Sequence, residues 1–470
     1  MLRPLLALLL LACSAPAAQD AAERPPNLLL ILADDMGYGD PVCFQAESAI
    51  PTPHLDRLAS EGVRFTDAHS PGSVCVPTRY GLMTGRYPCR ERRFPVGRGS
   101  VIEAERLTLP GHLRAAGYAT AMVGKWHLGF DGGPLPTSAE LRGGPLDRGF
   151  EHFFGMHASL DIPPYYYVRG RAPVAPPNET IEASGTEGWT NIQGAFWRGG
   201  PVAPGFVHAE VHGRFEQGAL AYLDERAEQE QPFFLYLALA SPHTPWLPSE
   251  EFAGTTPVDL YGDFVAQVDA TVGALLDALE RNAQAENTLV IFTSDNGPVW
   301  YPADVERFEH AATGPWRGMK GDAWEGGHRM PFLARWPGRA PAGATCAQTL
   351  CFTDLLATAA DLCGRPLPEG TTEDSHSLLP VLLDPSAATT RTTTVHKADA
   401  SAIREGRWKL INHLGSGGFS SPRRVEPVEG GPRGQLYDLE ADPGETTNLW
   451  DEQPEVVERL SAALAAYAED

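Results

Sequence analysis

The stretch NLLLILADDMGYGD, residues 27–40, places an apolar run directly before a pair of aspartates. The run Leu28–Leu32 lacks polar alternation, which is typical of a strand buried on both faces of a sheet covered by helices. Asp34 and Asp35 follow where that strand is expected to end. Adjacent carboxylates repel each other unless a cation or hydrogen-bond donors hold them, so the pair suits a hard divalent ion with oxygen ligands. Turn or capping residues are the ordinary alternative.

Three further segments show the same pattern of an apolar run followed by a polar cluster. Helical patterns lie between them, and this alternation favours an α/β fold. We therefore predict a large mixed, mostly parallel sheet sandwiched by helices, with a small C-terminal α+β domain. Because ligands gather beyond the carboxyl ends of parallel strands, the polar clusters are expected to converge. The segments are Ala121–Val123 before Lys125 and His127, Phe233–Ala240 before His243, and Leu289–Phe292 before Asp295 and Asn296.

The tetrapeptide SDNG, residues 294–297, has two interpretations. Asn-Gly in isolation is a hairpin signal. After a buried-type strand, however, Asp295 and Asn296 offer a carboxylate and an amide oxygen. Both are good ligands for the same ion that Asp34 and Asp35 would hold.

Basic side chains at these positions are notable because the chain is acidic, with a formal net charge of −23. Such a surface excludes nucleic acid as a partner unless basic groups are concentrated in one place. Lys125, His127, His243 and Lys320 each have an ordinary explanation as a loop, turn or solvated residue. Together they suit an anionic ester substrate, with a group that protonates the leaving oxygen.

The N-terminus is typical of a secretory signal, with Arg3 before a short apolar core from Leu5 to Ala12. We assign residues 1–18 to it. Either cleavage follows small residues near Ala18, or the signal ends before Cys13, as in a bacterial lipoprotein. We expect an exported protein, whether periplasmic, secreted or lipid-anchored at the cell surface, with membrane contact only through an anchor at Cys13.

Two regions follow the main strand-helix pattern less closely. After about residue 390, short strands and a terminal amphipathic helix predict a small antiparallel-sheet plus helix subdomain at 391–470, after a catalytic α/β domain at 25–390. Residues 130–210 are loop-like and rich in aromatics. Tyr165–Tyr167, Trp189 and Trp197 either line a substrate cleft or fix a long loop to the body of the protein.

Cys75 lies in SVCVPTRYGLMTGRYP, residues 73–88, between a Pro/Gly-rich loop and Arg79. Its ordinary explanations are half of a disulfide or a buried thiol. As a nucleophile it would need a base and a positive environment, and Arg79 supplies only the charge. Export permits disulfides, and three late cysteines are close enough in sequence to pair locally: Cys346, Cys351 and Cys363.

The segment CVPTRYGLMTGR, Cys75 to Arg86, resembles the signature of the sulfatase family, the formylglycine-dependent, arylsulfatase-like enzymes of the alkaline phosphatase superfamily. Thr78 replaces the commoner serine. Further segments resemble the family in the same order, from about residue 25 to 450: NLLLILADDMGYGD, GKWHLG, SPHTPW, SDNG, RGMKGDAWEGGHRMPFLARWPG and LYDLEADPGETTNL.

This resemblance implies a sulfuric ester hydrolase that cleaves a sulfated carbohydrate or an aryl sulfate. A separate formylglycine-generating enzyme would oxidise Cys75 while the chain is unfolded. One Ca²⁺ would be held by Asp34, Asp35, Asp295 and Asn296, with the oxidised residue 75 also touching it.

The resemblance also implies roles for the remaining groups. The hydrated aldehyde attacks sulfur, with Asp295 as proton acceptor, and His243 and Lys320 lie near the leaving oxygen, one of them protonating it. Arg79, Lys125 and His127 orient the nucleophile, and His127 helps the sulfated intermediate collapse. Three residues near Lys320 are further candidates for biasing the substrate: Asp322, Trp324 and His328.

Two alternatives remain at this stage. A phosphatase or phosphodiesterase of the same superfamily would need additional Asp and His ligands in its two-metal members, and usually a Ser or Thr nucleophile. A lipoprotein that binds a sulfated glycan without cleaving it would fit if residue 75 remained a thiol.

Overall fold

The computed structural model describes residues 24–91, 99–135, 140–371, 373–397 and 401–469. The predicted signal segment, with Cys13, lies outside them. The four predicted strands are neighbours in a ten-stranded sheet, in the order β11-β1-β10-β4. Their bounds are Thr288–Ser294, Asn27–Asp34, Phe233–Pro242 and Ala119–Lys125. All three pairings between them are parallel.

Further strands extend this central block on both sides and make the sheet mixed. On one side β12 pairs antiparallel with β11, β2 pairs antiparallel with β12, and β13 pairs parallel with β2. On the other side β5 pairs parallel with β4, β6 pairs antiparallel with β5, and β7 pairs antiparallel with β6. The expected fold class is confirmed. The added strands are β12 (Phe332–Arg335), β2 (Val63–Phe65), β13 (Ala344–Cys346), β5 (His152–Met156), β6 (Val168–Arg169) and β7 (Ala172–Pro173).

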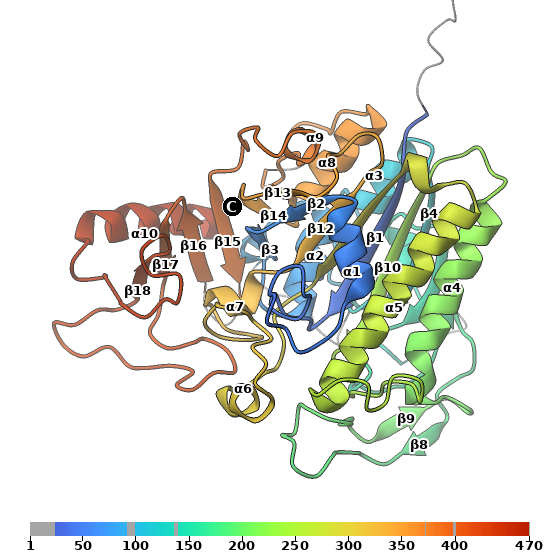
Figure 1. Ribbon diagram of the computed structural model, residues 1–470, viewed down its shortest axis with the longest axis horizontal. Coiled ribbons are helices and arrows are strands. Elements are labelled where there is room, and N and C mark those ends of the chain that lie inside the picture. Colours follow the sequence, from blue (N-terminus) through green and yellow to red (C-terminus); the bar gives the residue numbers. More distant parts are fainter. Residues whose placement is uncertain (1–23, 92–98, 136–139, 372, 398–400, 470) are drawn as a thin grey trace, which may run out of the picture.

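Strand β1 is buried on both faces because its alternate side chains enter two separate cores. Leu28, Leu30 and Leu32 belong to one core, and Leu29, Ile31 and Ala33 belong to the other. One group of helices covers each face of the sheet (Figure 1). The first group is α2 (Cys75–Thr84), α3 (Leu109–Ala115), α8 (Asp354–Cys363) and α9 (Leu379–Leu383), and the second is α1 (Pro53–Ser60), α4 (Val211–Arg226) and α5 (Asp259–Arg281).

The C-terminal part forms a second, antiparallel sheet in the order β15-β16-β17-β18, packed against one long helix. It lies beside the main sheet and is reached after α9 (Figure 1). The small α+β unit is therefore confirmed, while the boundary at 390/391 stays a prediction. Its elements are β15 (Thr393–Lys397), β16 (Ser401–Glu405), β17 (Trp408–Ile411), β18 (Gln435–Asp438) and α10 (Pro454–Glu469).

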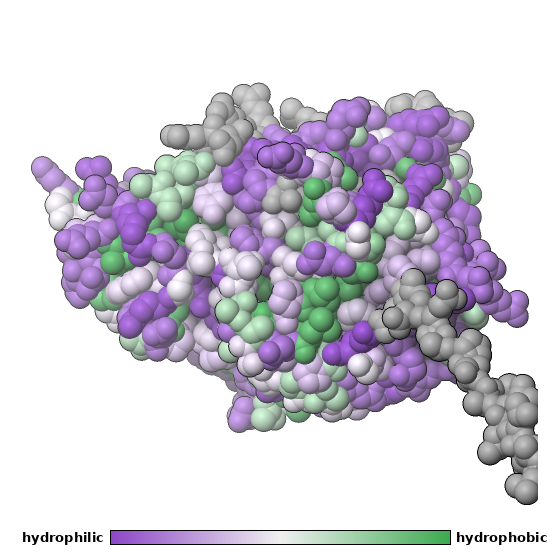
Figure 2. Space-filling model, turned by 90° about the horizontal axis from the view of Figure 1, so that it is seen from above, coloured by the Kyte–Doolittle hydropathy of each residue, from purple (hydrophilic) through white to green (hydrophobic). Residues whose placement is uncertain are grey.

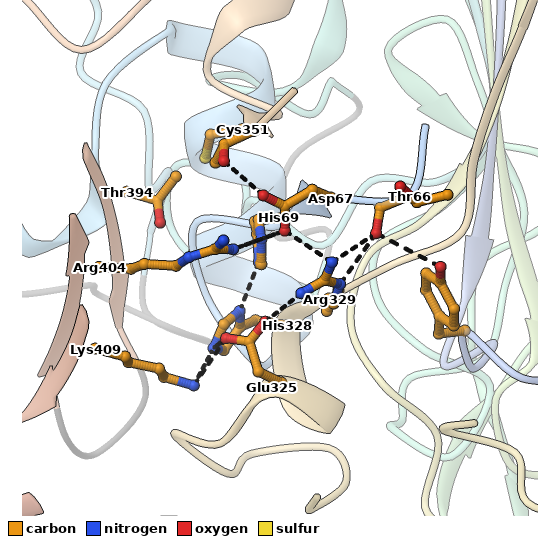
Figure 3. Close-up of polar contacts among 12 residues, drawn as sticks. Thr66, Asp67, His69, Glu325, His328, Arg329, Cys351, Thr394, Arg404 and Lys409 are labelled. Atoms are coloured by element: carbon orange, nitrogen blue, oxygen red, sulfur yellow. Dashed lines mark hydrogen bonds and ion pairs between the residues drawn. The ribbon is translucent and has the colours of Figure 1, made fainter. Parts of the chain in front are cut away.

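A buried polar cluster joins the two parts (Figure 3). Lys409 from β17 donates to His328 Nε2 at 3.0 Å, so the His328 proton lies on Nδ1 and is donated to His69 Nδ1 at 3.1 Å. His69 in turn donates from Nε2 to Asp67 at 3.0 Å. Lys409 also contacts the buried carboxylates of Glu325 and Glu445. The cluster lies where α7 (Glu325–His328) and β3 (Ala68–His69) meet the second sheet.

The six cysteines among the described residues are all free thiols, so the local disulfide pairing considered for the late cysteines is not formed. The face seen from above is mostly hydrophilic, with a limited group of hydrophobic residues (Figure 2). No helix among the described residues combines the length and apolar character needed to cross a bilayer.

Candidate active site

The polar residues predicted to converge do meet at the carboxyl ends of the central strands. Asp34 and Lys125 are the last residues of β1 and β4. Lys125 Nζ donates to Asp34 Oδ2 at 2.5 Å, and the backbone N–H of Asp35 donates to Asp295 Oδ1 at 3.2 Å. The parallel order of the strands therefore brings together segments that are more than 250 residues apart in the chain.

Three carboxylates and one amide form an oxygen-rich group at this point. Asp34, Asp35 and Asp295 are buried, and Asn296 Nδ2 donates to Asp35 Oδ1 at 2.6 Å. The amide oxygen of Asn296 is buried and has no hydrogen-bond partner among the described residues. An orphaned amide oxygen beside three buried carboxylates is the donor set that a hard divalent cation prefers. The residues thus fit the ion that the sequence predicted.

Cys75 begins helix α2 and points at the same group. Its Sγ lies 3.4 Å from Asp34 Oδ1, and the side chain is only 5% exposed. One ligand atom from each of Asp34, Asp35, Cys75 and His243 falls within 4.8 Å of the others. Burial, with Asp295 nearby, raises the pKa of the Cys75 thiol. The unmodified residue is therefore not a thiolate nucleophile in this arrangement.

Cations surround the carboxylates. Arg79 lies on α2, and its Nε donates to Asp295 Oδ2 at 3.0 Å, while Nη1 donates to the Lys125 carbonyl at 2.8 Å. Lys320 Nζ donates to Asp35 Oδ2 at 2.6 Å. His243 donates from Nδ1 to the Thr244 carbonyl at 2.6 Å, which leaves Nε2 facing Asp35 at 3.6 Å.

The charges shift the protonation of several groups. Burial alone would raise the pKa of Asp34, but Lys125 and the other cations hold it well below its usual value. Burial and the neighbouring Asp34 raise the pKa of Asp295. Burial, together with Lys125 and Arg79, lowers the pKa of His127 well below its usual value, so His127 is neutral here.

Two of these residues have a strained backbone. Asp35 and His127 have φ values of 66° and 55°, in the left-handed region that non-glycine residues seldom adopt. Such conformations are found where the surrounding structure fixes a functional side chain. The Nδ1 atom of His127 is buried without a hydrogen-bond partner among the described residues, and the side chain lines a cavity.

This cavity, of about 630 Å³, opens above Cys75 and is also lined by His127, His243 and Lys320. Sequence reasoning missed several of its other lining residues. Ser159 has a buried hydroxyl oxygen without a partner among the described residues, and serine in a loop gave no signal. Further missed residues carry charge or bulk and come from four separate segments: Asp161, Arg198, Lys397, and Phe419 with Arg423.

The aromatic side chains predicted from residues 130–210 do not line this cavity, although Asp161 and Arg198 of the same stretch do. Tyr165 and Tyr166 are completely buried, and Trp189 packs edge-on against Trp246 at 4.9 Å. Tyr167 and Trp197 are likewise absent from the cavity wall. Of the two interpretations, the structure favours aromatics that fix a long loop to the body of the protein.

The three residues near Lys320 considered for substrate bias also lie elsewhere. Asp322 accepts hydrogen bonds from the Ser420 backbone and hydroxyl, and His328 belongs to the cluster with Lys409. Trp324 packs under the guanidinium of Arg317 at 3.6 Å. All three face the C-terminal subdomain rather than the cavity, because the glycine-rich turn that carries Lys320 points only that lysine inward.

Buried carboxylates and cations at the strand ends of a mostly parallel α/β sheet fit the hydrolase of the alkaline phosphatase superfamily that the sequence resemblance implied, and the comparisons identify sulfatases. A solved Bacteroides thetaiotaomicron structure from work on the metabolism of multiple glycosaminoglycans superposes with a TM-score of 0.83 at 31% identity, covering 95% of this chain and 100% of that one. The model of the Sulfatase family matches residues 26–365.

Curated relatives point the same way. The chain is similar to an N-acetylgalactosamine-6-O-sulfatase of Bacteroides thetaiotaomicron, at 32% identity over 97% of this chain and 96% of the relative. It is also similar to human arylsulfatase A, at 34% identity over 92% and 85%. The chain belongs to the sulfatase family and is an enzyme that hydrolyses sulfate esters.

Proposed function

We propose that the chain cleaves a sulfate ester of a carbohydrate, using a formylglycine made from Cys75 and one Ca²⁺ held by Asp34, Asp35, Asp295 and Asn296. The observation that carries this proposal is the meeting of a buried thiol, three buried carboxylates and an unpartnered amide oxygen at one point. Membership of the sulfatase family supports the modification of this particular cysteine.

When present, the hydrated aldehyde supplies the attacking oxygen and the ion supplies positive charge beside it. The residues of the chain supply the rest. Asp295 accepts the proton of the nucleophile at a carboxylate oxygen. Arg79 and Lys125 hold Asp295 and Asp34 in place through the contacts described above.

The leaving alcohol needs a proton, and two groups lie where they can donate it. Lys320 carries one on Nζ, 2.6 Å from Asp35. His243 already donates its Nδ1 proton to a carbonyl, so it acts as an acid only through Nε2, as an imidazolium. Preorganised cations at a developing alkoxide stabilise the transition state more than the ground state.

A carbohydrate substrate is proposed because one relative is named for a sulfated amino sugar, and because hydrogen-bonding side chains such as Ser159, Asp161 and Arg198 line the cavity. A panel of sulfated monosaccharides and disaccharides, beside an aryl sulfate and an aryl phosphate, tests the choice. Faster sulfate release from one sugar than from the aryl ester is expected. Preference for the phosphate, or for the aryl ester over every sugar, would overturn it.

The modification is tested directly by mass spectrometry of the tryptic peptide Phe65–Arg79 from protein made in a host with the maturation enzyme. An aldehyde at residue 75 is expected, together with about one equivalent of calcium by elemental analysis. Because Cys75 is buried, access by a maturation enzyme before folding fits the proposal. An unmodified thiol in active protein would refute it, and an unmodified thiol in inactive protein would favour a binding role.

Export is proposed from the sequence of the N-terminus. N-terminal sequencing of the mature protein distinguishes cleavage near Ala18 from cleavage before a lipidated Cys13. Recovery of the intact N-terminus from the cell interior would contradict export.

A further inference from the structure

The solvent end of the active-site cavity carries three cations that the reaction described above does not use. Arg198, Lys397 and Arg423 line the same cavity as Cys75 and Lys320. Arg198 and Arg423 are exposed, whereas Cys75 is 5% exposed, so the arginines lie nearer the mouth and the catalytic group lies at the base. Arg198, Lys397 and Arg423 come from three segments far apart in the chain, and the fold brings all three to one opening.

Arg198 is held in position by a buried carboxylate. Its Nη1 donates to the Asp161 carbonyl at 3.1 Å and also pairs with the Asp161 carboxylate, while its guanidinium lies over the ring of Phe196 at 5.3 Å. Asp161 is 5% exposed, and among the described residues it is the one carboxylate that lines this cavity. Lys397 and Arg423 are the other two cations that line the mouth.

Lys397 is anchored to the loop that leads into Cys75. Its backbone N–H donates to the Pro71 carbonyl at 3.0 Å, and its own carbonyl accepts from Ser73 at 3.4 Å. Its Nζ donates to the Glu91 carbonyl at 3.4 Å. The ammonium group therefore has a fixed place beside the nucleophile loop.

Arg423 and Phe419 are presented by a closed loop of the C-terminal subdomain, residues 414–425. Ser416 donates to the Pro422 carbonyl and Gly417 to the Arg423 carbonyl, which closes the loop on itself. The loop is fixed to the turn that carries Lys320, because the Ala323 backbone N–H donates to the Ser416 carbonyl at 2.8 Å and the Ser420 hydroxyl donates to Asp322. Phe419, 41% exposed, adds an apolar surface beside the arginine.

A sulfate monoester carries one negative charge, and the base of the cavity already meets it with cations. Three more cations at the mouth have no role toward that group, and they are unusual in a chain of net charge −23. We propose that the mouth of the cavity binds a second anionic group of the substrate, a carboxylate or a second sulfate on the sugar next to the one that is cleaved. This inference rests on the proposed function, which places the scissile sulfate at the base.

Side-chain cations that are already held in place favour binding of an anionic group, because they lose little conformational entropy when the group binds. A charge-assisted contact to one anion changes affinity by about 10- to 100-fold. The substrate class is therefore a glycan fragment with at least two anionic groups, rather than a singly charged aryl or steryl ester.

The test uses three disaccharides that share the sulfated sugar cleaved fastest in the panel above. Their neighbouring sugar is a uronate, the methyl ester of that uronate, or a hexose with its own sulfate. The wild-type kcat/KM is expected to be about 10- to 100-fold higher for one or both anionic forms than for the neutral ester. The form that shows the gain identifies the anion. Equal kcat/KM for all three overturns the inference.

The matched variants are Arg423→Gln and Arg424→Gln, which remove the same charge from adjacent exposed positions. Only Arg423 lines the cavity. Arg423→Gln is expected to reduce the preference for the anionic form by about tenfold, mainly through KM, and Arg424→Gln to keep it. An equal loss in both variants would mean a general effect of surface charge and would refute the subsite.

Failure of the proposed function is recognised separately. If protein with a verified aldehyde at residue 75 releases no sulfate, the reaction assignment fails. Calorimetric binding to the Cys75→Ser protein then still decides the subsite, with the three disaccharides built on the sulfated N-acetylgalactosamine for which a relative is named. Weaker binding of the neutral ester supports it, and equal binding of all three overturns it.

Discussion

Replacement of Lys409 by methionine should destabilise the protein in a way that depends on pH. Lys409 Nζ lies 3.0 Å from Glu325 and 2.8 Å from Glu445, and all three side chains are fully buried. The substitution removes the shared cation and keeps most of the volume. It leaves two buried carboxylates, of which only Glu325 retains a close arginine, Arg329 at 3.0 Å.

The expected magnitude follows from the broken buried ion pair, which costs about 3–5 kcal/mol. With an unfolding entropy of about 2.1 cal/mol/K per residue over the roughly 430 described residues, this lowers the melting temperature by about 3–6 °C. Burial raises the pKa of Glu445 to about 7 even while Lys409 opposes the shift. Without Lys409 that pKa rises further.

The sign of the pH effect follows from this shift. A carboxyl group whose folded pKa lies above its unfolded value favours the folded state at low pH and loses that contribution as pH rises through the folded pKa. The difference in melting temperature between wild type and Lys409→Met should therefore be largest near about pH 8. It should shrink near about pH 5.5, where Glu445 is protonated.

Thermal unfolding followed by calorimetry or circular dichroism at both pH values measures this difference. The double variant Lys409→Met with Glu445→Gln is the matched control, because it removes both charges. It should recover most of the loss at the higher pH. A single variant that melts within about 1 °C of wild type at that pH, or a loss that is the same at both pH values, would refute the reasoning.

Three further predictions concern the reaction. Lys320→Ala and His243→Ala should each lower kcat by about 10²–10³-fold with an unchanged circular dichroism spectrum, because each removes one preorganised donor near the leaving oxygen; near-wild-type turnover would count against both roles. Removal of calcium with a chelator should abolish activity and lower the melting temperature, since buried carboxylates lose their cation, and added Ca²⁺ should restore both; full activity in metal-free protein would exclude the ion. Gly418→Ala should lower kcat/KM for the glycan by about 10- to 100-fold, because its Cβ would lie 2.0 Å from the Gly321 carbonyl carbon and displace the turn beside Lys320; Gly213→Ala, in α4, where nothing lies within 4 Å and the backbone is not left-handed, should not.

The base of the site could be predicted from sequence because its residues follow a local rule. Asp34, Lys125 and Asp295 each come at or directly after the end of an apolar strand, and parallel strands place such ends together. Cys75 was identified because its segment resembles the sulfatase signature. The residues around it did not by themselves indicate its role. The convergence of these groups then required only the order of the strands, which a strand-helix alternation already restricts.

The mouth of the cavity could not be predicted in the same way. Arg198, Phe419 and Arg423 lie on loops whose path is set by distant contacts, such as those of Asp161 and Asp322, and not by local periodicity. The aromatic segment shows the converse problem. Aromatic side chains give the same signal whether they line a cleft or fill a core, and here Tyr165 and Tyr166 fill a core.

The cluster of His69, His328 and His396, in which the rings of His328 and His396 stack at 3.7 Å, was hidden for a related reason, since each member alone is an ordinary buried histidine. In the structure, however, it acts with the loop at 414–425 to hold both catalytic loops. The loop before Cys75 is fixed where His396 hydrogen-bonds to the Ser70 carbonyl and Ser73 donates to the Lys397 carbonyl.

The turn that carries Lys320 is fixed by the same subdomain, at two points on either side of Trp324. Ser420 donates to Asp322 before it, and Lys409 pairs with Glu325 after it. In the proposed reaction, residue 75 and Lys320 act on opposite ends of the same displacement, and misplacement by about 1 Å is enough to cost about 10²-fold in rate. The loop before Cys75 and the turn that carries Lys320 are both attached to the C-terminal subdomain. The distance between them is therefore set by that subdomain and not by the loops themselves. The subdomain thus supplies none of the proposed catalytic groups, yet its packing sets the distance across which they work.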